Sequence, residues 1–399
     1  MRSLFIYLPS TLAMLGAGNA LAQQDPITLS AAYTWQSDSN LFRLPSNANV
    51  QALTGQSSAA ETIGVTTLGL GFNTKQSLQT LSLNLNLIDY QYQKFNYLSF
   101  TANNYNAAWQ WAITPKVTGT LSTERKETLN SFADFTGYRQ RNQRLDTTTR
   151  FDATYQLDGP WRLIAGTSTT RQENQLAQVT GSDYTTNNVD AGLRYAFASG
   201  STISYQMRAG KGTYLNRVVP NANALDDQYT QIDNDLRLRW DLGGGTTANA
   251  NITHINRTHP RYSQRDYSGF NSGAGLDWAL SGKTSISLAY SHLMEAYAAT
   301  NSNYSSTDRI SIGPVWQLSP KVGLRLKHEW AQRSYLGSPT TGLSSNRQDI
   351  TRETSLSVNW QAHDQLALSA SMRTASRGVN QVGLDYDSTM LFITAQLTY

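Results

Sequence analysis

Charged side chains recur at every second position in several otherwise apolar stretches of this chain. The pattern is clearest between Arg144 and Asp152 and between Asp233 and Asp241. Guanidinium and carboxylate groups in this arrangement can bind the hydroxyls and carboxylates of a polar solute. They can equally pair with one another across strands and serve only to hold a wall together. So many ions cannot share a dry core, because each unpaired ion there would cost several kcal/mol.

The charged face therefore predicts a wet lumen, and we assign the following residues to its lining. The pore-lining residues are Arg144, Asp146, Arg150, Asp152, Arg194, Arg208, Asp235, Arg237, Arg239, Arg325, Glu329 and Arg373. The same inward face also includes Glu124, Lys126, Arg162, Asp190, Asp233, Asp241, Asp277, Arg309, Lys327 and Glu353.

Residue patterns for catalysis or metal binding are sparse. His254, His292 and His328 fall on the apolar face of their segments, toward the long connections, whereas His259 and His363 lie in connections. The sequence has no Gly-x-Ser-x-Gly elbow, no His-x-x-x-His pair and no cysteine, so the common nucleophile and thiolate-zinc signatures are missing. We expect no enzyme, no cofactor and no metal; a barrel enzyme that uses a loop Asp–His pair is the open alternative.

The element that must position these charges is a β-hairpin, seen most clearly at Arg144–Thr169. From Leu145 to Leu157 the odd positions are apolar or neutral and the even positions are polar or charged, which is the period of a strand with two unlike faces. A tight turn at Asp158–Pro160 follows, and the alternation resumes from Trp161. The stretch reads as two antiparallel strands with one apolar and one ionic face.

The same unit repeats along almost the whole chain and leaves no other segment to cover the apolar faces. Lipid must then cover these faces. The pattern gives about 18 strands, each with the ~9–11 residues that a tilted barrel strand needs. The expected strands are 27–36, 62–73, 78–92, 104–113, 117–126, 144–157, 161–169, 186–198, 202–213, 228–242, 246–256, 269–280, 284–294, 309–318, 322–330, 349–360, 366–374 and 389–399. The sequence predicts an all-β fold, a transmembrane antiparallel up-and-down β-barrel. An oversized soluble β-sandwich or solenoid is the alternative.

Tryptophans mark one edge of the predicted apolar belt. Each lies within a few residues of a short turn: Trp111, Trp161, Trp240, Trp278, Trp316 and Trp360. An indole ring is most stable between acyl chains and headgroups. Short turns alternate with long loops, and the first and last connections are both long, so we expect both termini at the periplasmic, short-turn side.

Residues 1–22 have the features of a secretory signal peptide. Arg2 precedes an apolar run, and Ala20–Ala22 supplies a small-residue cleavage site. We expect a mature barrel of residues 23–399 in the Gram-negative outer membrane. Without Arg2 the chain has 31 Lys and Arg against 28 Asp and Glu, and this mild balance argues against nucleic acid as a partner. Mean hydropathy is −0.45, and no stretch after the signal is long and apolar enough for a helical span.

The long first loop, residues 37–61, is the other unusual segment. Its Asp38–Arg43 stretch combines polar turn formers with Leu41 and Phe42. The apolar residues predict that the loop folds inward as a partial plug or gate, or that it packs on a neighbouring loop. We assign Asp38, Asn40, Leu41, Phe42 and Arg43 as gate residues. A cation held by the oxygens of residues 37–40 is possible in principle, but such strings usually form turns and caps.

The segment that runs from Ala32-Tyr33-Thr34-Trp35 into Asp38-Ser39-Asn40-Leu41-Phe42-Arg43-Leu44-Pro45 resembles the EpsL-type outer-membrane proteins of exopolysaccharide operons, a β-barrel porin family. The close match covers about ten residues, and the remainder agrees in length, signal peptide and strand pattern. The resemblance implies a role in polysaccharide export, with periplasmic or outer-membrane export proteins, outer-membrane lipid and lipopolysaccharide as partners. It supplies no catalytic residues.

Together these features predict a passive, hydrated outer-membrane channel through which an extracellular polysaccharide leaves, gated by its loops. The alternative is a general diffusion porin for oligosaccharides or small polar solutes.

Overall fold

Eighteen antiparallel strands form the body of the protein in the computed structural model, which describes residues 26–133, 139–220, 225–299, 302–337 and 346–399. Residues 1–22, the predicted signal peptide, lie outside the described residues. The strands are β1 (Ile27–Asp38), β2 (Glu61–Gln76), β3 (Gln79–Tyr92), β4 (Phe100–Thr114), β5 (Val117–Leu129), β6 (Gln143–Gln156), β7 (Trp161–Asn174), β8 (Tyr184–Ala196), β9 (Thr202–Tyr214), β10 (Gln228–Gly243), β11 (Thr246–Thr258), β12 (Tyr267–Ala279), β13 (Thr284–Ala299), β14 (Ser302–Ser319), β15 (Val322–Leu336), β16 (Gln348–His363), β17 (Leu366–Val379) and β18 (Tyr386–Thr398).

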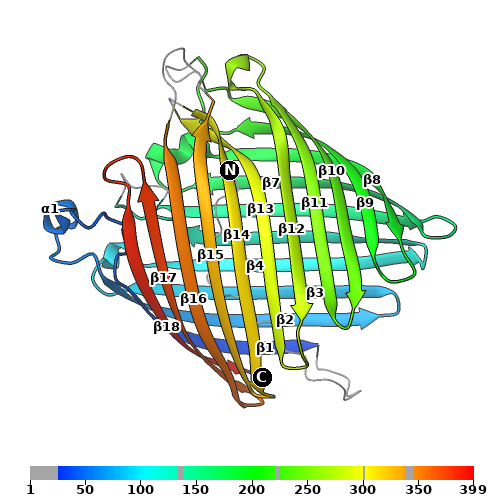
Figure 1. Ribbon diagram of the computed structural model, residues 1–399, viewed down its shortest axis with the longest axis horizontal. Helices are drawn as coiled ribbons and strands as arrows, with labels where there is room; N and C mark the ends of the chain where they lie inside the picture. The colour runs from blue at the N-terminus through cyan, green and yellow to red at the C-terminus, as the bar shows by residue number, and fades with distance from the viewer. Residues whose placement is uncertain (1–25, 134–138, 221–224, 300–301, 338–345) are drawn as a thin grey trace.

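The sheet closes on itself. Every strand pairs with its neighbours in the sequence, and β1 pairs with both β2 and β18. The closing ladder runs from Ser30 opposite Thr398 to Asp38 opposite Met390. Figure 1 shows the resulting barrel, with its two walls crossing in projection. Closure removes the open edges that a sheet could not expose in hydrocarbon, so the predicted transmembrane β-barrel is confirmed.

The outer surface of the barrel is apolar over most of its height. The predicted apolar face is the solvent-accessible face in every strand, as Leu68, Phe151, Leu236 and Ile393 illustrate at 40–58% exposure. The tryptophans Trp161, Trp240, Trp278, Trp316 and Trp360 stand exposed beside the short turns. This is the girdle expected where a barrel meets headgroups.

The strands extend further toward the long loops than the alternation predicts. The largest difference is β14, which begins at Ser302 rather than at Arg309. Beyond the apolar belt the outward residues become polar, as at Asp308 and Ser306, so the hydrophobic signal ends while the backbone ladder with β15 continues to Tyr304. A strand read from hydrophobic period therefore stops at the edge of the belt.

Short helical segments occur only in the long connections of the described chain. Three are short 3-10 helices, η1 (Asn96–Leu98), η2 (Ala177–Ser182) and η3 (Ser263–Arg265). The fourth, α1 (Val50–Thr54), lies in the first loop and projects from the rim in Figure 1. None of the helices in the described segments is long and apolar enough to cross a membrane.

A close approach on the lipid side sets the shape of the wall between β4 and β6. Trp111 stacks on Phe151 with ring centroids 5.7 Å apart, and its indole lies over Gly119 of the intervening strand β5. A Cβ at position 119 would overlap both this indole and the backbone oxygen of Asp152. Glycine is therefore required at this position.

Gly119→Ala should lower the temperature at which the folded, fast-migrating form on a gel converts to the unfolded form, because overpacking costs about 1–3 kcal/mol. The matched control is Gly282→Ala, since a Cβ there would meet nothing within 4 Å. Equal melting of the two variants would contradict the packing described for Trp111.

Candidate functional site

The inner wall of the barrel is polar and charged. All twelve residues assigned to the pore lining lie on strand positions that alternate with the exposed apolar residues, so their side chains face the interior. On β6, for example, Arg150 and Asp152 flank Phe151, which faces outward. The fold therefore places these twelve side chains on the inner wall. Their role in transport stays a prediction.

Five of the inward groups on β6–β9 form one continuous network, with Asp190 at its centre. Arg150 is 2.5 Å from Asp152 and 3.1 Å from Asp190, and Arg208 lies 3.9 Å from the same Asp190 carboxylate. Gln206 donates a further hydrogen bond to Asp190 at 2.5 Å. Gly166 leaves the space for this network, because a Cβ there would lie 2.9 Å from both Arg150 and Asp190. These charges compensate one another.

Other predicted lining residues are also paired. Arg144 contacts Asp146 at 2.8 Å, and Arg237 contacts Asp235 at 2.5 Å. On β14 and β15, Glu329 lies 3.2 Å from Arg309 and 2.9 Å from Lys327. Between β16 and β17, Arg373 lies 3.3 Å from Glu353. Most partners are two positions apart on one strand or on the adjacent strand, which supports the structural role for these residues.

Arg162, Arg194, Arg239 and Arg325 differ from that pattern. In the described parts of the chain, none of their guanidinium groups has a carboxylate within 4.0 Å or a side-chain hydrogen bond. Arg162 on β7 stands directly opposite Arg194 on β8 in the strand register. The alternation of the sequence marks these residues as inward-facing, but it cannot separate them from the paired arginines.

The predicted gate segment forms a closely hydrogen-bonded turn. Asp38 is 2% exposed. Its carboxylate pairs with the Arg43 guanidinium at 2.9 Å and accepts a hydrogen bond from the Ser388 hydroxyl at 2.9 Å. The Asn40 side chain accepts from the Leu44 amide at 2.9 Å and donates to the carbonyls of Leu44 and Asp387. The carboxylate is thus occupied by protein donors, as expected for turn chemistry, and the segment ties the end of β1 to β18.

Apolar residues of the same loop enter a buried core at the long-loop end of the barrel. Phe42 meets Phe95 and Phe132 edge to face at 4.7 and 4.8 Å. The core also contains inward-facing strand residues such as Ile63 and Phe100. The loop therefore packs on its neighbours and on the inner wall together. Gate function itself stays a prediction.

The connection after β5 reaches across the same end of the barrel. The backbone oxygen of Ala133 accepts a hydrogen bond from Arg377 on β17 at 2.7 Å, although β18 and β1–β4 lie between β5 and β17 around the wall. Arg377 is buried and also donates to the Leu384 carbonyl. This contact narrows the long-loop end of the lumen.

A second internal packing, which the sequence did not reveal, lies against β9–β12. We refer to Tyr214, Arg217, Tyr229, Arg257 and Tyr267 as the arginine–tyrosine cluster. Its guanidinium groups stack on rings, with Arg217 3.4 Å from Tyr214 and Arg257 3.8 Å from Tyr229. Delocalised cations on aromatic faces need no carboxylate partner.

Imidazole groups in the described residues make structural contacts. His254, His292 and His328 are on the outward face, as predicted, and contact Ser268, Asp308 and Thr354. His259 lies 3.1 Å from Asp266 in the loop beyond β11. Burial lowers the pKa of His259, the Asp266 carboxylate opposes that change, and the Arg257 cation adds to it. The described chain holds no cluster of three or more candidate metal ligands.

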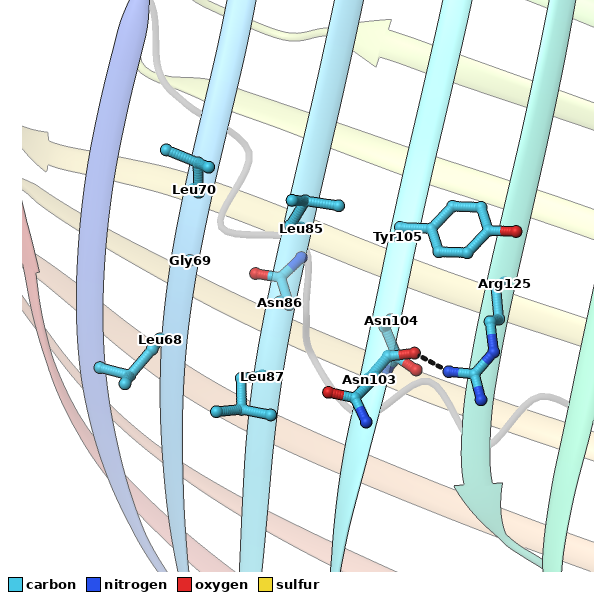
Figure 2. A pocket seen from close by; sticks show the side chains of 10 residues that line it. All are labelled: Leu68, Gly69, Leu70, Leu85, Asn86, Leu87, Asn103, Asn104, Tyr105 and Arg125. Atoms are coloured by element: carbon cyan, nitrogen blue, oxygen red, sulfur yellow. Dashed lines mark hydrogen bonds between the residues drawn. The ribbon is translucent and has the colours of Figure 1, made fainter.

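A hollow of about 680 Å³ lies on the outer face of the barrel, over β2–β5. Figure 2 shows the leucines of β2 and β3, Tyr105 of β4 and Arg125 of β5 around it. Leu68, Leu70, Leu85 and Leu87 are all exposed, and Arg125 donates to the Asn103 carbonyl and pairs with Glu127. These features suit an acyl-chain contact at the lipid face.

A closed barrel with an apolar belt outside and ionised groups inside defines a porin-like channel of the Gram-negative outer membrane. Residues 238–399 match the family model described as "Putative beta-barrel porin 2". No curated protein matches the sequence. The match and the fold support a β-barrel porin, whereas the specific link to EpsL-type proteins stays a prediction.

Solved porins of Pseudomonas aeruginosa share the fold at low sequence identity. OpdK, crystallised with vanillate, aligns with a TM-score of 0.52 and 12% identity over 94% of this chain and 99% of its own. OccK9 (OpdG) aligns with a TM-score of 0.53 and 11% identity over 94% of this chain and 98% of its own. OccK3 (OpdO) aligns with a TM-score of 0.53 and 13% identity over 93% of this chain and 96% of its own.

Phe42→Ala should release the first loop from its core, because truncating a buried phenylalanine costs about 3–5 kcal/mol. Arg43 is now largely buried, so trypsin should cut after it in the variant and not in the wild type, while the barrel stays folded. Leu53→Ala in the exposed α1 is the control. Resistance of the Phe42 variant would show that the Asp38–Arg43 contacts suffice to hold the loop.

Proposed function

We propose that the protein is a passive diffusion channel for oligosaccharides or other small polar solutes. The observation that carries the proposal is the inner wall, where ionised side chains line a barrel whose outside is apolar. Such a wall can replace part of a solute's hydration shell with fixed donors and acceptors, and no step of that kind requires catalysis. The similarity to solved porins supports a channel, and one of them, OpdK, was crystallised with the small organic molecule vanillate.

The packed long-loop end suggests a size limit for this channel. Loop residues fill the mouth beside β2–β5, and Ala133 contacts Arg377 of β17. The arginine–tyrosine cluster covers the wall at β9–β12. Small solutes fit such a narrowed mouth better than a thick polymer does.

Export of an extracellular polysaccharide is the second candidate, and the resemblance of Asp38–Pro45 to EpsL-type proteins favours it. In that case export proteins of the periplasm or outer membrane would be the partners. The start of β1 and the end of β18, which are joined where the Leu29 amide donates to the Tyr399 carbonyl, would lie on the periplasmic side.

Liposomes containing the purified barrel should swell in galactose, more slowly in raffinose and not in a large dextran. The physical reason is size selection by the narrowed mouth. Heat-unfolded protein in the same liposomes is the control. Absence of swelling in galactose, with the protein folded, would contradict the diffusion-channel proposal.

Gene deletion distinguishes the two candidates. A diffusion channel predicts reduced uptake of small sugars with secreted polysaccharide unchanged. Loss of secreted polymer with unchanged uptake would instead support export. The measurement uses both assays on one deletion strain, and restoring the gene on a plasmid should reverse whichever defect appears.

A further inference from the structure

Four arginines form one basic row on the inner wall near the short-turn end. We name Arg162, Arg194, Arg237 and Arg239 the arginine row. The register places Arg162 of β7 opposite Arg194 of β8, Arg194 opposite Ser204 of β9, and Ser204 opposite Arg237 of β10. Arg239 is the next inward position on β10, opposite Thr202. The arginines therefore come from β7, β8 and β10, at one register level except for Arg239, which is one inward position nearer the turn.

Neighbouring carboxylates compensate this row incompletely. Arg237 has Asp235 at 2.5 Å. In the described parts of the chain, the guanidinium groups of Arg162, Arg194 and Arg239 have no carboxylate within 4.0 Å. Asp241, the remaining acid nearby on β10, accepts from the Gly243 amide in the adjoining turn. The row is thus a local excess of positive charge.

Like charges directly opposite each other on adjacent strands destabilise a sheet. Opposing side chains in antiparallel strands have Cβ atoms about 4.5–5.5 Å apart, so Arg162 and Arg194 repel each other when nothing lies between them. On β6, β8 and β9, by contrast, Arg150 and Arg208 share the carboxylate of Asp190, which offsets their repulsion. In the described residues, Arg162 and Arg194 share no such carboxylate, and their guanidinium donors face the lumen.

We propose that the arginine row is an oxyanion-binding station that makes the channel prefer solutes carrying a carboxylate, such as sugar acids, over neutral ones. The planar guanidinium fork matches a carboxylate in two-point geometry. Several forks on one wall allow the anion to be passed from one to the next without tight binding, which conduction requires. The inference rests on the proposed diffusion function and names its preferred substrate class.

The test is ion selectivity in planar bilayers. Reversal potentials in gradients of KCl and of potassium galacturonate give the permeability of each anion relative to K⁺. We expect both ratios to exceed one in the wild type and to fall at least about threefold in Arg162→Gln/Arg194→Gln, since two fixed positive charges leave the wall. Arg162→Lys/Arg194→Lys keeps the charges, so it should keep the chloride preference and lose part of the galacturonate preference.

The matched control is Arg309→Gln, which removes an inward positive charge from a compensated site. Its partner Glu329 keeps Lys327 at 2.9 Å, so selectivity should change far less than in the arginine-row variant. A change half as large as that of the arginine-row variant, or larger, would overturn the station, because each removed charge would then count equally and net lumen charge alone would explain selectivity. A wild-type anion ratio of one or less overturns it without any variant.

Galactose swelling separates this inference from the diffusion proposal. Normal swelling without anion preference would reject the station and leave the channel intact. No conductance and no swelling in folded protein would reject the channel itself.

Discussion

The ladder between β1 and β18 is the contact on which the structure depends. A sheet in hydrocarbon has no water to bind its free backbone groups, and each unsatisfied group costs several kcal/mol. The ladder satisfies these groups from Ser30 to Asp38. Its two ends are fixed further, by mutual hydrogen bonds between Leu29 and Tyr399 at the short-turn end and by Asp38 with Ser388 at the loop end. The segment predicted to act as a gate thus also locks the closing seam.

Closure gives each strand one inside and one outside, and the distribution of charge follows from that. Ionised groups on the inside share a confined space, so most of them find a partner two residues away or on the next strand, as Arg150 does with Asp152 and Asp190. The arginine row is the exception on β7–β10. Because the wall is compensated at one place and basic at another, the electrostatic potential varies along the lumen, and such variation lets a passive channel select among ions.

Two different packings hold the long-loop end. Beside β2–β5 the loops bury an apolar core around Phe42 and Phe95, as in a soluble domain. Beside β9–β12 the filling is made of tyrosines and stacked arginines. Both anchor loops against the inner wall, and both use inward residues that lie beyond the apolar belt. The barrel therefore has a wet, charged half and a half that is narrowed by folded loops.

The sequence by itself determined the strands, their order and their faces, because a period of two is a local property that survives in any barrel. It placed Arg194 and Arg239 on the inner wall and Trp240 at the belt's edge. Only the tertiary structure decided which charges pair, since Arg150 meets Asp190 through the register of β6–β8. It also decided that Phe42 packs on Phe132 and that Ala133 reaches Arg377. Such contacts join residues far apart in the chain, and their geometry follows from strand stagger and closure, which no local pattern encodes.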